Sequence, residues 1–244
     1  MSSRPTPFLE KLDSATSKTE CGLYMFEGFL PPDEAQDAFD VLGDDEKFPW
    51  NTKPLLYGEL MTQHAYEHNR YKNKKSKKKK KKISNSEGLS KLEAICSQLE
   101  QEFDVKISDV FCNRFQDPKH RVDWHKDTYG RHICVLTLGS KRRIEFRNNK
   151  TKQVEEMTPS TGDLYLMPLN LNNTHKHRVC SAEESTTLSE QNHSTGTRLS
   201  FVFFFEVPSY AKEFKISTKD KIDGFIEELI EDILSETLMM LLFD

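Results

Sequence analysis

Two histidines and an aspartate are spaced as ligands of a single metal ion. His125 and Asp127 stand two residues apart in V-D-W-H-K-D-T-Y at 122–129, and two such residues on a strand project to the same face. Later in the chain, T-H-K-H-R-V at 174–179 offers His175 or His177 as a third ligand. Two imidazoles and one carboxylate on one face of a metal leave positions open, which is the ligand arrangement of non-haem Fe(II) oxygenases. An isolated H-x-D pair usually consists of exposed residues that bind no metal. The metal-site interpretation therefore depends on a further feature, a residue that could bind a co-substrate.

Arg198 provides that feature at the start of the apolar strand R-L-S-F-V-F-F-F at 198–205. A guanidinium at the edge of a buried strand is costly unless an anion pairs with it. A dicarboxylate co-substrate would provide a bidentate partner, and Ser200, two residues on, points the same way. The order H-x-D, distal histidine, R-x-S therefore predicts an oxygenase with an anionic co-substrate.

A sheet of short strands is expected to position these residues. Apolar or alternating runs separated by turn residues are typical of a β-sandwich or open barrel. Pro31-Pro32-Asp33 predicts the start of a helix that Gly43 ends, and apolar residues recur at helical spacing from Leu89 to Phe103. We therefore predict a mainly β fold with flanking helices. The predicted strands cover 22–30, 110–115, 132–138, 142–147, 162–167, 175–180 and 197–206.

Taken together, these segments resemble the AlkB-type Fe(II)/2-oxoglutarate dioxygenases over about residues 22–207. The resemblance implies a double-stranded β-helix, or jelly-roll, core and the use of Fe(II), 2-oxoglutarate and O2. The similar segments are L-Y-G-E-L at 56–60, C-N-R-F at 112–115, V-D-W-H-K-D at 122–127, L-T-L-G-S-K-R-R-I-E-F-R at 136–147, G-D-L-Y-L-M at 162–167, His175 to Val179, and R-L-S-F-V-F-F at 198–204.

The same resemblance implies roles for individual residues. The family's spacing from Gly162 selects His177 over His175 as the third metal ligand, so the implied catalytic metal set is His125, Asp127 and His177. The residues implied to bind 2-oxoglutarate are Arg198, Asn113 and Ser200. The residues implied to contact the substrate are Tyr57, Glu59, Trp124 and Arg142.

Three positions differ from the family's pattern. Thr128-Tyr129 stands where members that act on alkylated nucleic acid often carry an acidic pair. Phe115 replaces a tyrosine that helps to hold 2-oxoglutarate, and Phe204 replaces a second arginine.

The predicted function is oxidative N-demethylation of nucleic acid, as in DNA repair or RNA demethylation. Two alternatives stay open: an oxygenase acting on a protein side chain or small metabolite, and a non-catalytic binding member of the fold.

The chain divides into a core and appendages. We expect a loose tail at 1–20, a dioxygenase domain at 21–212 and an acidic amphipathic helix at 213–244, which docks on the barrel or binds a protein partner. Nine lysines fall between Lys72 and Lys82. Such a run cannot pack, so 72–82 is expected to be a solvated insertion, a nuclear-import signal or an arm that contacts phosphates.

The composition excludes several other classes of protein. The 244 residues carry a formal net charge of -4. The five cysteines include no Cys-x-x-Cys pair, which argues against a zinc cluster or a disulfide framework. The N-terminus lacks the pattern of a secretory signal, and no stretch approaches the length of an apolar membrane span. We therefore expect an intracellular protein of the nucleus or cytoplasm, with nucleic acid as its substrate and no membrane partner.

Overall fold

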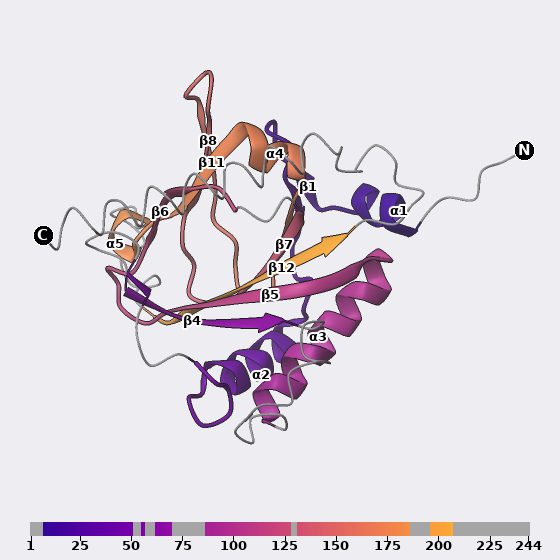
Figure 1. The fold of residues 1–244 in the computed structure, drawn as a ribbon, viewed down its shortest axis with the longest axis vertical. Coiled ribbons are helices and arrows are strands. Elements are labelled where there is room, and N and C mark those ends of the chain that lie inside the picture. The colour runs from indigo at the N-terminus through magenta and orange to yellow at the C-terminus, as the bar shows by residue number, and fades with distance from the viewer. Residues whose placement is uncertain are drawn as a thin grey trace, which may run out of the picture.

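A computed structural model describes residues 7–50, 55–56, 62–69, 86–127, 131–185 and 196–206. Within these residues, antiparallel strands dominate and the helices are few (Figure 1). The helices are α1 Pro7–Asp13, α2 Pro32–Gly43, α3 Glu87–Phe103, α4 Leu169–Thr174 and α5 Ala182–Ser185. The strands are β1 Ser17–Lys18, β2 Tyr24–Phe26, β3 Leu55–Leu56, β4 Thr62–Asn69, β5 Lys106–Phe115, β6 Val122–His125, β7 His132–Gly139, β8 Ile144–Asn148, β9 Val154–Met157, β10 Leu164–Met167, β11 His175–Val179 and β12 Arg198–Glu206.

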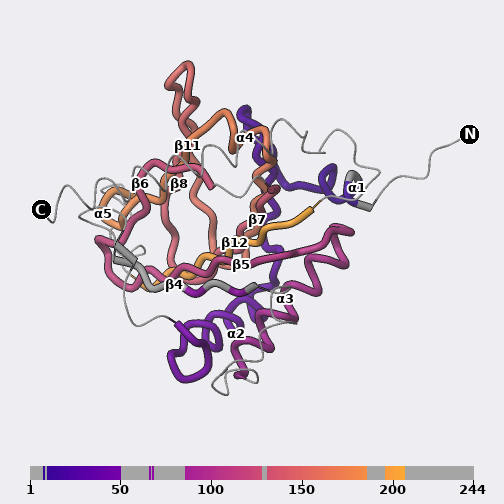
Figure 2. Tube along the Cα trace, viewed as in Figure 1, coloured from indigo at the N-terminus to yellow at the C-terminus, as the bar shows by residue number. Residues whose placement is uncertain are grey.

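The described strands form two antiparallel sheets. The large sheet has eight strands in the order β1-β2-β10-β7-β12-β5-β4-β3, and the small sheet has four in the order β6-β11-β8-β9. Helices α2 and α3 lie on one side of β4 and β5, and β6, β8 and β11 lie on the other side (Figure 1). Helix α4 carries the chain from β10 in the large sheet to β11 in the small one (Figure 2). This arrangement is consistent with the jelly-roll core that the sequence predicts.

The large sheet separates two hydrophobic cores because its side chains alternate between faces. Leu199, Phe201 and Phe203 of β12 pack in the core that the sheet shares with the helices. Phe204, on the opposite face of the same strand, packs in the core between the two sheets, together with Phe146 of β8. The functional residues of β12 therefore lie between the sheets, and the helices support the sheet from behind.

Local sequence signals explain where the two longer helices begin and end. Pro32 stands in the first turn of α2, where its missing N–H costs nothing. The Ser86 hydroxyl caps α3 by accepting from the N–H of Leu89 at 3.2 Å. Asp104 ends α3 in a left-handed conformation, with φ of 50°. Both helices match the sequence prediction.

Most predicted strands are confirmed in the structure, with shifted ends. The runs at 110–115, 132–138, 142–147, 162–167, 175–180 and 197–206 correspond to β5, β7, β8, β10, β11 and β12. Strands β4 and β9 were not predicted, since their sequences are polar. Within 22–30, only Tyr24–Phe26 forms a strand.

The prediction of a loose tail at 1–20 is wrong for its described part. Residues Pro7–Asp13 form α1, in which Phe8 and Leu12 are one helical turn apart and both are buried. The Phe8 ring lies 6.3 Å from that of Phe205, so α1 packs against β12. Side chains four residues apart lie on the same face of a helix, so Phe8 and Leu12 can both pack into the core on this face of the large sheet.

Several expectations lie outside the described residues. These are the lysine-rich insertion at 72–82, the acidic helix at 213–244, and the substrate positions Tyr57 and Glu59. In the described part of the chain, every helix is too short or too polar to cross a bilayer.

Candidate active site

The three predicted metal ligands meet at one end of the small sheet. His125 closes β6 and pairs in register with His177 of β11. Asp127 lies two residues beyond the end of β6. One ligand atom from each residue lies within 4.8 Å of the other two. The two imidazoles and the carboxylate therefore face a common point, as a single divalent cation requires.

Hydrogen bonding orients the imidazole of His125 for metal binding. Its Nδ1 lies 2.7 Å from the carbonyl oxygen of Asp123. A carbonyl only accepts, so Nδ1 carries the proton and the lone pair of Nε2 is free. The Nε2 atoms of His125 and His177 lie 3.8 and 3.4 Å from the carboxylate oxygens of Asp127. The ring of His177 stacks on Phe146 at 5.8 Å between centroids, which fixes its plane.

The charge states of this cluster suit a cation. Burial and the neighbouring His177 lower the pKa of His125 to about 4, so its imidazole is neutral at physiological pH. Burial pushes the pKa of Asp127 upward, but attraction to His177 and His125 outweighs burial, and the pKa lies below its ordinary value. A neutral imidazole beside an ionised carboxylate is the state in which these side chains bind metal.

Asn172 of α4 holds the backbone of Asp127 in place. Its side-chain oxygen accepts from the N–H of Asp127 at 3.1 Å, and its amide nitrogen donates to the Asp127 carbonyl. Asn172 is buried. Because Asp127 lies beyond the ladder of β6, this two-way contact takes the place of strand pairing in positioning the carboxylate.

His175, the alternative third ligand, lies outside the cluster. Its Nδ1 contacts the Thr174 hydroxyl at 2.9 Å, and its Nε2 lies 3.4 Å from the amide nitrogen of Asn148. Among the described residues, the grouping that could hold a metal contains His177 and not His175.

Arg198 is a fully buried guanidinium facing the space between the sheets. It is 0% exposed, and its Nη2 donates to the Thr137 hydroxyl at 3.3 Å. Its Nε and Nη1 have no hydrogen-bond partner in the described part of the chain. Burial, with a smaller opposing effect from Tyr165 and a further lowering by Arg142, brings the pKa of Arg198 to about 10. Two unfilled donors on a buried cation fit the distal carboxylate of a dicarboxylate.

Asn113 and Ser200 lie beside this guanidinium on the same face. Ser200 pairs with Asn113 of β5 on one side and with Thr137 of β7 on the other. Asn113 and Ser200 are both buried. Gly139 pairs with Arg198, and a Cβ at Gly139 would lie 2.4 Å from the carbonyl oxygen of Thr197. A side chain at Gly139 would thus displace the segment that leads into Arg198.

Trp124 and Arg142, the two predicted substrate residues that the structure describes, make their side-chain contacts away from the metal cluster. Trp124 is adjacent to His125 on β6 and so points to the opposite face of the small sheet. There it lies between the guanidinium carbons of Arg147 and Arg178, 4.4 and 5.1 Å from its ring centroid. Arg142 is fully buried and donates to two backbone carbonyls, including that of Pro118 at 3.0 Å. Arg142 thus presents no surface to a substrate, whereas Trp124 is half-buried.

Sequence reasoning missed three residues of this site: Thr137, Asn172 and Tyr165. Thr137 and Tyr165 are polar residues within apolar runs, at positions whose alternation points between the sheets, and that signal was available. Asn172 stands in a short helix with no distinctive pattern, so only the fold reveals its contact with Asp127.

The chain is similar in sequence to a known enzyme superfamily and to an individual protein, and it aligns with a solved structure. The model of the 2OG-Fe(II) oxygenase superfamily matches residues 22–203, well over half of the chain. An uncharacterized protein of Acanthamoeba polyphaga mimivirus is 28% identical over 91 residues, which cover 36% of this chain and 48% of that protein. The chain thus aligns with about half the length of this curated relative. A crystal structure of a Pseudomonas putida prolyl-4-hydroxylase aligns with a TM-score of 0.48 and 13% identity, covering 82% of this chain and 97% of that one.

Proposed function

The chain belongs to the 2OG-Fe(II) oxygenase superfamily, and from that premise we propose that it is an oxidative demethylase of alkylated nucleic acid. As a member it is a dioxygenase, an oxidoreductase that uses Fe(II), 2-oxoglutarate and O2. In this proposal His125, Asp127 and His177 hold the iron. Arg198, Asn113 and Ser200 bind the co-substrate.

One observation carries the site assignment. A cluster of two imidazoles and a carboxylate and a buried guanidinium with two unfilled donors both face the space between the sheets. A metal alone would need no buried arginine, and an anion site alone would need no such ligand set. A co-substrate that chelates iron at one end and carries a carboxylate at the other uses both features.

The residues supply orientation while the bound iron supplies the oxidising chemistry. His125, Asp127 and His177 would hold the iron and leave coordination positions for the co-substrate and O2. The N–H of His125 Nδ1 and the amide of Asn172 fix the directions of two ligands. Apolar side chains between the sheets, such as Phe146 and Phe204, keep bulk water from the space behind the metal.

The reaction balances with one O2 per turnover. An N-methyl group takes one oxygen atom and becomes N-hydroxymethyl, which releases formaldehyde and leaves an N–H. The other oxygen atom enters succinate as 2-oxoglutarate loses CO2. Support for nucleic acid as the substrate comes from the AlkB-type segments and the lysine-rich run at 72–82.

A second candidate is hydroxylation of a protein side chain or small metabolite. Thr128-Tyr129 favours it, since the acidic pair common in nucleic-acid demethylases is missing there. Succinate formation with Fe(II), ascorbate and O2, measured with and without a methylated single-stranded oligonucleotide, separates the two. Stimulation together with formaldehyde release supports demethylation. Turnover that the oligonucleotide leaves unchanged refutes it in favour of the second candidate.

A further inference from the structure

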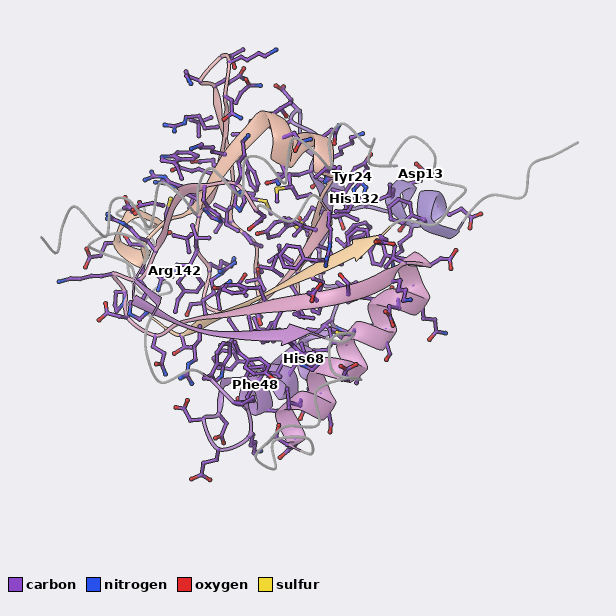
Figure 3. All side chains as sticks on the ribbon, in the orientation of Figure 1. Asp13, Tyr24, Phe48, His68, His132 and Arg142 are labelled. Carbon is purple, nitrogen blue, oxygen red and sulfur yellow. The ribbon has the colours of Figure 1, made fainter. Side chains whose placement is uncertain are left out.

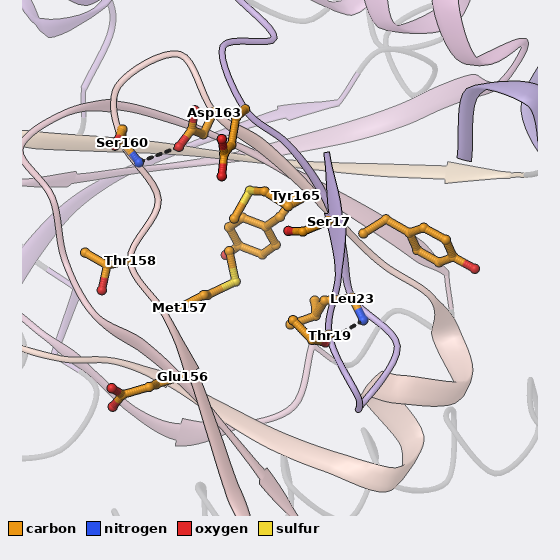
Figure 4. A pocket seen from close by; sticks show the side chains of 12 residues that line it. Ser17, Thr19, Leu23, Glu156, Met157, Thr158, Ser160, Asp163 and Tyr165 are labelled. Atoms are coloured by element: carbon orange, nitrogen blue, oxygen red, sulfur yellow. Dashed lines mark hydrogen bonds between the residues drawn. The ribbon is translucent and has the colours of Figure 1, made fainter. Parts of the chain in front are cut away.

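Tyr165 is a buried phenol in the space where the co-substrate is proposed to bind. It is 5% exposed and lies in the core between the sheets. The ring projects from β10 toward Met157 of β9 (Figure 4). The side chain also forms part of the wall of a cavity of about 460 Å³ between β2, β9 and β10. Packing therefore does not close the space around the ring.

The register of the large sheet sets Tyr165 on the same face as Arg198. Tyr165 pairs with Val135 of β7, and Val135 pairs with Val202 of β12. Val202 and Arg198 are four residues apart on β12, and side chains at even spacing share a face. One strand, β7, separates the strand of Tyr165 from that of Arg198.

The phenol is available as a donor. Among the described residues, the hydroxyl of Tyr165 makes no hydrogen bond to another side chain or to the backbone, and the side chain borders the cavity, so its O–H can donate to a bound molecule. Burial raises the pKa of Tyr165, opposed by the charge of Arg198 and reinforced by that of Asp127. The group thus stays protonated at physiological pH, and the two charges that act on it belong to the two ends of the proposed co-substrate site.

The site needs such a donor because Phe115 provides none. The Phe115 ring lies against the guanidinium of Arg198, 5.3 Å from its carbon to the ring centroid, and is fully buried. A bound carboxylate has about four lone-pair positions to fill. Arg198 can fill two of them from one edge of its guanidinium, where Nη2, which has a second N–H, stands beside either Nε or Nη1. The Thr137 hydroxyl, which accepts from Nη2, keeps its own proton to donate. Asn113 of β5 and Ser200 of β12 lie on one side of this anchor and β10 lies on the other, so the fourth position is open to a donor from β10.

We propose that the Tyr165 hydroxyl donates to the distal carboxylate of 2-oxoglutarate, supplying from β10 the contact that Phe115 cannot make from β5. The inference rests on the proposed role of Arg198 as the anchor of that carboxylate. Tyr165 is thus a co-substrate-binding residue that comes from a strand different from the one the sequence comparison indicates.

The test measures binding without turnover. The full-length chain is loaded with Mn(II), and the Kd values of 2-oxoglutarate and of 2-oxobutyrate, which lacks the distal carboxylate, are measured by calorimetry. We expect Tyr165→Phe to weaken 2-oxoglutarate about tenfold, as loss of a hydrogen bond to a charged group does. The Kd values of 2-oxobutyrate and of Mn(II) should change less than about twofold. A variant whose site is merely destabilised would instead lose affinity for all three ligands.

Phe115→Tyr provides a second variant that leaves Tyr165 in place. Its affinity for 2-oxoglutarate should match that of the wild type, because the donor position is already filled. In the Tyr165→Phe background, the same change should restore most of the lost affinity. If Phe115→Tyr alone increases the affinity for 2-oxoglutarate tenfold, the donor position at the distal carboxylate is vacant in the wild type. That result overturns the inference, whether or not Tyr165→Phe folds.

The outcomes separate this inference from the proposed function. If the wild type binds 2-oxoglutarate no more tightly than Tyr165→Phe does, the role of Tyr165 is refuted while the co-substrate site stands. Equal losses for 2-oxoglutarate and 2-oxobutyrate also refute it, since the contact would then lie away from the distal carboxylate. A wild-type protein that binds Mn(II) but no 2-oxoglutarate removes the anchor at Arg198, and the inference with it.

Discussion

Replacing Asn172 with alanine should weaken metal binding without touching a ligand. The substitution removes both hydrogen bonds that hold the backbone of Asp127. Each contributes about 1 kcal/mol net, so freeing this segment costs about 2 kcal/mol of pre-organisation. At about 1.4 kcal/mol per tenfold, the expected loss of Mn(II) affinity is roughly 30-fold, within the 10–100-fold typical of residues behind metal ligands.

Asn173→Ala is the matched control. Asn173 is the next residue of the same short helix and is exposed, so its loss changes helix propensity but not the contact with Asp127. Mn(II) binding is measured for both variants by calorimetry, and urea unfolding of the metal-free proteins records their stability. If Asn172→Ala binds Mn(II) as tightly as Asn173→Ala, the backbone contact does not position the ligand and the reasoning is refuted.

Three further predictions concern the rest of the site and the small sheet. Asp127→Ala should abolish both Mn(II) binding and succinate formation while its circular dichroism stays that of the wild type; retained metal binding would remove Asp127 from the ligand set. Arg198→Ala should weaken 2-oxoglutarate by roughly a hundredfold, from two charge-assisted hydrogen bonds worth about 3 kcal/mol together, and an unchanged Kd would mean that another residue anchors the co-substrate. The hydrogen bond from Arg178 at 2.8 Å is the main cause that lowers the pKa of Glu145 below its ordinary 4.5, so its stabilisation is complete above pH 4.5 and disappears as the pH falls through the lower folded-state value. The urea midpoints of the wild type and Glu145→Gln should differ at pH 6 and converge in acid; a constant difference would contradict this origin.

Residue types and spacing predicted the ligand set because strand geometry fixes which side chains can meet. His125 and His177 meet through direct pairing of β6 and β11. Asp127 meets them for a different reason, since it lies beyond the strand and depends on Asn172. The i, i+2 rule thus indicated a residue that reaches the cluster, although the chain there is no longer a strand.

The positions of the other predicted residues also have physical causes. Trp124 lies next to a ligand in sequence, but alternation along β6 points it away, to where two guanidiniums flank it. Arg142, implied by the resemblance to contact the substrate, is buried and donates to two carbonyls of the β5–β6 connection. Tyr66 and His68 lie on β4 and face the helices. Tyr66 packs on Phe48, and His68 pairs with a glutamate of α3 at 2.6 Å (Figure 3). Such contacts depend on which face tertiary packing covers, which local sequence does not encode.

The positions of β12 and β6 in their sheets give the two halves of the site different resistance to local opening. Strand β12 is paired on both sides, with β5 and with β7, so the amides around Arg198 should exchange with solvent only when the whole domain unfolds. Strand β6 is an edge strand paired on one side only, with β11, and its amides should exchange through small local fluctuations. The segment around Arg198 should therefore open only with global unfolding. Strand β6, which carries His125, should open and reclose while the rest of the protein stays folded. In the proposed function, the iron site would accordingly exchange its ion without unfolding of the whole domain.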